Sequence, residues 1–130
     1  MKRTEDFILI IVILVFILTG CEGGTSPAVR SVENYLEAFV NKEEALMASY
    51  VCPAFEVEAY IEFDSFALVQ TALEGLVCLE TGGEAGKAVI VCQGSIEATY
   101  GNEVRSFDLS ERKYTVVESH GDWLVCGYTE

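Results

Sequence analysis

Apolar residues near the start of the predicted domain are spaced as in a helix. They recur mainly three or four positions apart, which places their side chains on one helical face. The residues of this set are Val29, Val32, Leu36, Phe39 and Val40. Ser26 is a favourable N-cap, and Pro27 suits the first helical position because its missing N–H costs nothing there. We therefore predict a helix that begins at Ser26 and is broken at Asn41.

Two shorter helical segments are predicted to follow. Asn41 and Glu44 have the spacing of a capping box, which favours a second helix from Lys42 to about Val51. The segment 55–63 is ambiguous, because its apolar residues alternate as in a strand and also fall at helical intervals. Its glutamates favour a helix over a strand. We predict a third helix there, with a strand as the alternative.

From about Thr71 the pattern changes to strands separated by glycine-containing turns. The strand-like segments are residues 72–80, 87–100, 103–118 and 123–128. The alternation changes phase near Ser110–Lys113, which we interpret as a bulge within the third strand. Consecutive hairpins predict a curved, four-stranded antiparallel meander. Two to three N-terminal helices packed on such a sheet define an α+β fold class.

The N-terminus carries a different pattern. An unbroken apolar run from Phe7 to Leu18 follows Lys2 and Arg3. This run is shorter than the roughly 20 residues of a membrane-spanning helix, and a basic start before a short apolar run is typical of a signal peptide. The run ends in Leu-Thr-Gly-Cys at residues 18–21, which resembles the lipobox of bacterial lipoproteins. This resemblance implies cleavage before Cys21 and a diacylglycerol on its sulfur.

An ordinary secretory signal or a short membrane anchor is the alternative interpretation of this segment. The predicted organisation is a signal peptide at residues 1–20, a flexible tether at 21–26 and a single α+β domain at 27–130. A chain of this length supports one hydrophobic core. We expect the protein to be exported and attached by lipid to a membrane, facing outside the cytoplasm.

The chain is strongly acidic, with 21 Asp and Glu against 8 Lys and Arg and a formal net charge of −13. Nucleic acids are bound mainly through basic side chains, so this composition argues against a nucleic-acid partner. It also argues against adhesion to anionic lipids, so membrane attachment would depend on lipidated Cys21. The acidic residues are scattered rather than spaced as metal ligands, and we interpret them as a solvated surface.

Four cysteines remain besides Cys21, and an even number in a small exported domain predicts two disulfides. Of the three connectivities, we favour Cys78–Cys92, across one hairpin, and Cys52–Cys126, between the helical part and the last strand. A zinc site is the alternative. It is disfavoured because the sequence has no Cys-x-x-Cys pair and its only histidine is His120. We expect neither a metal nor another cofactor.

The chain from about residue 27 to 128 resembles the nuclear transport factor 2-like, or cystatin-like, superfamily. It is particularly similar to small bacterial lipoproteins with a degenerate version of that domain. The segments that carry the resemblance are the helix pair at 29–51, Asp64-Ser65-Phe66, Leu-Glu-Gly-Leu at 73–76 and the Gly-Asp-Trp turn at 121–123. The resemblance implies a conical pocket between the helices and a concave sheet. Enzymes of the superfamily place an acid–base Asp or His in that pocket.

Three residues are candidates for such chemistry: Asp64, Asp108 and His120. A lone carboxylate without a positioned partner is weak support for acid–base catalysis, and we interpret both aspartates as caps or solvated residues. His120 falls in a predicted turn, where a surface position is the simpler interpretation. We therefore predict no catalytic residue.

Aromatic side chains could line an apolar pocket with phenol groups as polar contacts, although filling a small core is the simpler interpretation. The candidates are Phe39, Tyr50, Tyr60, Tyr114 and Trp123. The sequence thus predicts a non-catalytic domain that binds a small apolar ligand or a protein partner. A pocket enzyme of the isomerase or dehydratase type and a homodimeric interaction module are the alternatives.

Overall fold

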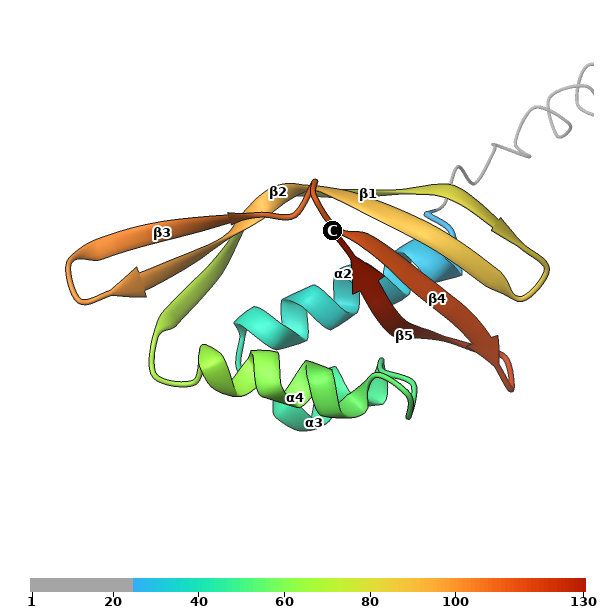
Figure 1. Ribbon diagram of the computed structural model, residues 1–130, viewed down its shortest axis with the longest axis horizontal. Coiled ribbons are helices and arrows are strands. Elements are labelled where there is room, and N and C mark those ends of the chain that lie inside the picture. Colours follow the sequence, from blue (N-terminus) through green and yellow to red (C-terminus); the bar gives the residue numbers. More distant parts are fainter. Residues whose placement is uncertain (1–24) are drawn as a thin grey trace, which may run out of the picture.

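The structure, a computed structural model, describes residues 25–130 as three helices followed by an open five-stranded antiparallel sheet. The elements are α2 (Pro27–Val40), α3 (Glu44–Ser49), α4 (Glu56–Ser65), β1 (Gln70–Glu84), β2 (Lys87–Tyr100), β3 (Glu103–Asp108), β4 (Lys113–Ser119) and β5 (Asp122–Thr129). The sheet arches over the helices, which all lie on its concave side (Figure 1). The predicted α+β fold class is confirmed. The predicted signal peptide and lipidated Cys21 lie outside the described residues.

Helix α2 starts as the sequence predicts. The Ser26 hydroxyl accepts a hydrogen bond from the Val29 backbone N–H at 3.2 Å, and Pro27 is the first helical residue. The apolar face of α2 is buried, with Val32 and Leu36 essentially inaccessible to solvent. The predicted break at Asn41 is confirmed, because this residue is the C-cap of α2. Its predicted role as N-cap of the next helix was wrong.

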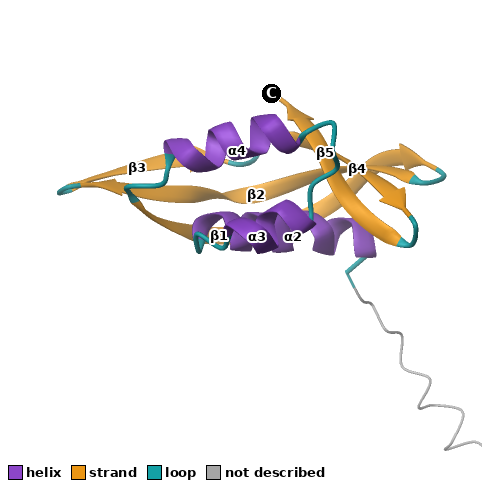
Figure 2. Ribbon diagram, turned by 90° about the horizontal axis from the view of Figure 1, so that it is seen from below, coloured by secondary structure: helices purple, strands orange, loops and turns teal. Residues whose placement is uncertain are grey.

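Helix α3 is shorter than the predicted segment 42–51, and its N-cap position is Glu43. The ambiguous segment forms helix α4, so the helical interpretation is confirmed. Helix α4 lies beside α2 and α3 beneath the sheet (Figure 2). Aromatic rings fill the space between these helices, with Phe39 of α2 making edge contacts to Phe63 at 5.8 Å and to Phe66 at 5.6 Å between ring centroids.

The sheet has one strand more than predicted. Strand β2 is central: it pairs with β1 on one edge, and on the other edge with β4 and then β3. The segment read as one bulged strand is therefore two strands, separated by residues 109–112. In this connection the Leu109 side chain is fully buried and its N–H donates to the Gly94 carbonyl at 3.0 Å.

Gly94 explains why the third strand is interrupted. It has a φ of +101°, and a Cβ there would lie 2.4 Å from the Glu74 carbonyl oxygen of β1. The pairing of β1 with β2 changes register between Glu74 and Val77, opposite this glycine. Such irregularities bend strands. A neighbouring strand cannot stay paired across the bend, so β3 ends and β4 begins there.

Two disulfides connect the cysteines with the favoured pairing. Cys78–Cys92 joins residues that face each other on β1 and β2. Cys52–Cys126 joins the segment after α3 to β5, where the Cys52 N–H also donates to the Val125 carbonyl at 2.9 Å. Disulfides persist in oxidising compartments, which indicates an extracytoplasmic environment.

Within residues 25–130, no helix has the length and apolar composition needed to cross a bilayer.

Candidate functional site

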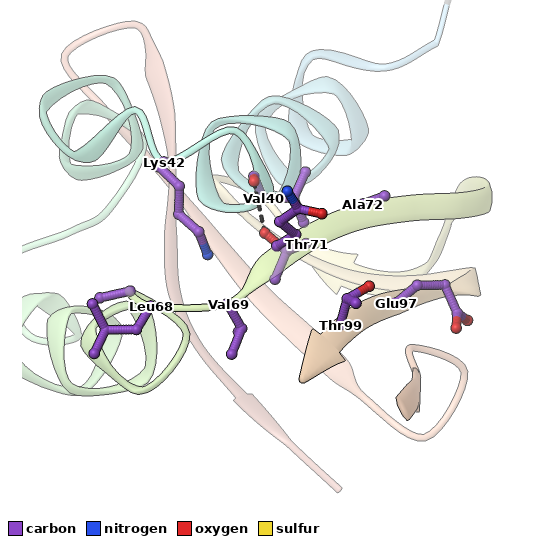
Figure 3. Close-up of a pocket in the computed structure, with 10 residues that line it drawn as sticks. Val40, Lys42, Leu68, Val69, Thr71, Ala72, Glu97 and Thr99 are labelled. Carbon is purple, nitrogen blue, oxygen red and sulfur yellow. Dashed lines mark hydrogen bonds between the residues drawn. The ribbon is translucent and has the colours of Figure 1, made fainter. Parts of the chain in front are cut away.

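A pocket of about 610 Å³ opens where the end of α2, the α4–β1 connection and the paired strands β1 and β2 meet (Figure 3). Five of the ten lining residues are apolar, and most of the exposed lining surface is apolar. Its lining comprises Val40, Lys42, Ala67, Leu68, Val69, Gln70, Thr71, Ala72, Glu97 and Thr99. We refer to it as the Lys42 pocket. Its volume falls within the range of about 300–1,000 Å³ that is typical of small-molecule sites.

The local backbone at the end of α2 places Lys42 in the pocket wall. The Lys42 N–H donates to the Phe39 carbonyl at 3.3 Å, and the Glu43 N–H donates to the Ala38 carbonyl at 2.9 Å. This pair of bonds is the Schellman motif, in which the residue after the C-cap adopts the left-handed conformation. Lys42 does so, with a φ of +62°. Glycine is the usual residue at this position, because a side chain there costs conformational energy.

The Lys42 amine is buried, and within the described part of the chain it has no hydrogen-bond partner. The Nζ atom lies 6.0 Å from the ring centroid of Phe63 and 5.8 Å from that of Phe66, both contributed by the α4 side of the pocket. Rings at this distance attract a cation weakly. Desolvation by the surrounding groups lowers the pKa of Lys42 below its ordinary value.

Two of the other polar side chains around the pocket, Thr71 and Glu97, are engaged in hydrogen bonds. The Thr71 hydroxyl donates to the Val40 carbonyl at 2.7 Å, the bond drawn in Figure 3. The Glu97 carboxylate accepts hydrogen bonds from the hydroxyls of Ser106 at 2.6 Å and Ser95 at 2.7 Å. These bonds, first that of Ser106, lower the pKa of Glu97. In Figure 3 this carboxylate is directed away from Lys42.

The apolar part of the pocket extends to an exposed rim. In Figure 3 the Lys42 side chain extends toward the segment that carries Leu68 and Val69, and Leu68 at the edge is 100% exposed. A completely exposed leucine beside a pocket offers apolar surface that an occupant could cover. The arrangement thus combines a mostly apolar lining surface with one cation whose amine is buried.

The five aromatic residues predicted to line a pocket are placed elsewhere. Phe39 and Tyr114 are 1% and 0% exposed, so they belong to the core, as the alternative interpretation stated. Tyr60 is partly buried and packs against the same core. Tyr50 and Trp123 line a second pocket, of about 500 Å³, beside the N-terminal half of α2. None of the five lines the Lys42 pocket.

The residues weighed for acid–base chemistry also lie apart from this pocket. Asp64 is exposed on α4. Asp108 accepts a hydrogen bond from the Ser110 N–H at 2.8 Å, and bonds from Ser110 lower the pKa of Asp108. His120 is exposed in the turn between β4 and β5, with a φ of +53°. Among residues 25–130, no three His, Cys, Asp or Glu side chains gather as metal ligands would.

A carboxylate that the sequence analysis did not select does face the interior. Glu62 of α4 forms an ion pair with Arg112 at 2.8 Å and accepts a hydrogen bond from the Tyr128 hydroxyl at 3.3 Å. Burial raises the pKa of the adjacent Tyr114 to about 12, so this phenol is protonated at neutral pH. Because Arg112 balances the charge of Glu62, we interpret the cluster as a structural connection between α4 and the sheet.

Lys42 was likewise missed, although the sequence contains a signal for it. It is the only Lys or Arg between Arg30 and Lys87, within a stretch rich in glutamate. A single basic residue in such a stretch is expected to form surface ion pairs. Only the structure shows that its amine turns inward, toward the rings of Phe63 and Phe66, instead.

The fold of the chain is similar to that of a solved structure, Aln2 from a Streptomyces species. The two share 10% sequence identity over 77% of this chain and 83% of the Aln2 chain, with a TM-score of 0.52. At this identity the likeness concerns the fold alone, and it supports the small α+β arrangement. Comparisons with protein-family models and with curated proteins give no match.

Proposed function

We propose that this protein is an exported lipoprotein whose single domain binds a small ligand with an apolar body in the Lys42 pocket. The observation that carries the proposal is the pocket itself. It is open and about 610 Å³ in volume, its lining surface is mostly apolar, and the fully exposed Leu68 lies at its rim. Clefts of this size with a mostly apolar surface are the usual form of small-molecule sites.

The proposed attachment through Cys21 is compatible with access to this pocket. The pocket lies at the C-terminal end of α2, whereas the tether joins the N-terminal end. From Cys21 to Pro27 the chain spans at most about 20 Å, so the domain would stay close to the membrane. The expected lipid chains, rather than the acidic surface, would hold it there.

The test uses the full chain with Cys21→Ser, exported so that its disulfides form but without the lipid. We expect decanamide, a neutral amphiphile, or decanoate, its anionic counterpart, to shift the NMR signals of Leu68, Val69 and Thr71. Leu68→Gln should weaken this binding because it removes apolar surface at the rim. Val57→Gln is the matched control, since Val57 is also an exposed apolar residue, at 67%, but lies outside the pocket. Absence of binding by both probes would contradict the proposal.

A second candidate is the homodimeric interaction module. Val77 and Leu79 flank the buried Cys78 on β1, so their side chains point away from the helices, and they are 55% and 62% exposed. An exposed apolar sheet face favours association with a second copy. The elution volume of the lipid-free chain tests this proposal. A dimer that becomes a monomer with Val77→Glu and Leu79→Glu would support it, and a monomeric parent chain would exclude it.

The pocket enzyme remains an alternative without a supporting observation. Neither Asp64 nor Asp108 lines the Lys42 pocket.

A further inference from the structure

The state of the Lys42 amine is unexpected in this chain. Acidic residues outnumber basic ones 21 to 8, so a carboxylate partner would be easy to supply. Yet within residues 25–130 the buried Nζ atom of Lys42 has no hydrogen-bond partner. Glu97 is the one acidic residue among the described residues that line the pocket, and its carboxylate accepts hydrogen bonds from two serine hydroxyls instead. A cation removed from water without a partner is costly, and the nearby rings offset only part of that cost.

The backbone gives a second indication that the side chain at position 42 is retained for its chemistry. Lys42 occupies the left-handed position of a Schellman motif, with a φ of +62°. Glycine would adopt this conformation without strain. A residue that costs conformational energy and then leaves its charge unpaired contributes little to folding, so its role is better sought in recognition.

We propose that the ligand of the Lys42 pocket is an amphiphilic carboxylate, whose head group pairs with the Lys42 amine while its apolar chain lies against Val69 and Leu68. This inference rests on the proposed function, because it names the chemistry of the ligand that the same pocket would hold. The pairing supplies the partner that the amine lacks, in a desolvated place where charge-assisted hydrogen bonds are strong.

The composition of the pocket favours a carboxylate over a phosphate. Lys42 is the only basic side chain in its lining, and no arginine contributes to it. Phosphate groups carry more charge and are commonly held by arginine forks or by helix N-termini. A single ammonium beside a mostly apolar lining surface matches a monoanion with a hydrocarbon chain.

The decisive experiment compares decanoate with decanamide, which have the same chain and differ in the charge of the head group. Calorimetric titration of the full chain with Cys21→Ser should show decanoate binding about tenfold to a hundredfold more tightly. Lys42→Met keeps an apolar stem without the charge and should abolish this preference. Lys87→Met, at an exposed lysine of β2 outside the pocket, should preserve it.

Lys42→Gly separates recognition from folding. The left-handed backbone accepts glycine readily, so this variant should unfold at the same or a higher urea concentration than the parent chain. It should nevertheless lose the preference for decanoate.

The outcomes distinguish the inference from the proposed function. Equal binding of both probes would overturn the anionic head group and leave an apolar-ligand pocket. Binding of neither probe would overturn the proposed function itself. A preference for decanoate that persists in Lys42→Met would show that another group recognises the charge.

Discussion

The two disulfides should contribute unequally to stability. Cys52–Cys126 connects residues 74 positions apart, whereas Cys78–Cys92 connects residues 14 apart. In the chain-entropy model, a cross-link stabilises the native state by restricting the unfolded chain, and a longer loop restricts it more. For these separations the model gives about 4.5 kcal/mol for Cys52–Cys126 and about 3 kcal/mol for Cys78–Cys92. The expected difference is therefore about 1.5 kcal/mol.

The assay must separate the cross-link from the packing of the sulfur atoms, because Cys78 and Cys92 are both deeply buried. Two double variants achieve this, Cys78→Ala with Cys92→Ala and Cys52→Ala with Cys126→Ala. Each variant retains one bridge, and urea unfolding is measured with and without reductant. The sequence is constant within each comparison, so the change in unfolding free energy reports the remaining bridge alone.

We expect reduction to cost more in the variant that retains Cys52–Cys126. An equal or smaller cost would refute the reasoning from loop length. It would indicate that neighbouring contacts, such as the hydrogen bond from the Cys52 N–H to the Val125 carbonyl, hold these segments together in the reduced protein and in its unfolded ensemble.

Three further predictions concern single sites. Gly94→Ala should lower the free energy of unfolding in urea by more than about 2 kcal/mol, because the added Cβ would overlap the backbone of β1. In the control variant Gly82→Ala, the added Cβ meets no atom within 4 Å, so the free energy of unfolding should change by less than about 0.5 kcal/mol. Decanoate binding should be strong while Lys42 is protonated and should be lost as pH rises through the lowered pKa of Lys42, which is a lower pH than for an ordinary lysine. Glu97, whose pKa is also lowered, stays ionised over this pH range. Unchanged decanoate binding up to pH 10.5 would contradict this prediction. Mass spectrometry of the membrane-extracted protein should find acylated Cys21 as the first residue, and a chain that starts at Met1 would disprove the lipoprotein assignment.

Much of the helical layer could be predicted because its signals are local. The cap at Ser26 and the proline after it define the start of α2 within a single turn. The glutamates of 56–62 favour a helix where the apolar pattern alone is ambiguous, and the resemblance favours it as well. The even number of cysteines predicts two disulfides, and the order of helices and strands favours the observed pairing among three.

The sheet was less accessible to the same reasoning. The phase change near Ser110–Lys113 was visible, but its interpretation as a bulge or as a break depended on the neighbouring strand. Gly94 bends β2 against Glu74, and Leu109 then turns into the core instead of continuing the ladder. Those contacts join residues far apart in the chain, so no local window contains them.

The sequence by itself determined the α+β order of elements, the expectation of two disulfides and the expectation of export, because each depends on periodicity, counting or short motifs. It favoured one of three cysteine pairings, and the tertiary structure decided among them. The tertiary structure alone decided which side chains surround a pocket. Phe39 and Tyr114 carry the composition expected of pocket walls, yet packing buries them in the core. Lys42 has the composition of a surface residue, yet the end of α2 turns its amine over Phe63 and Phe66. Burial and desolvation depend on neighbours brought together by folding, and this is why the candidate site emerged only from the structure.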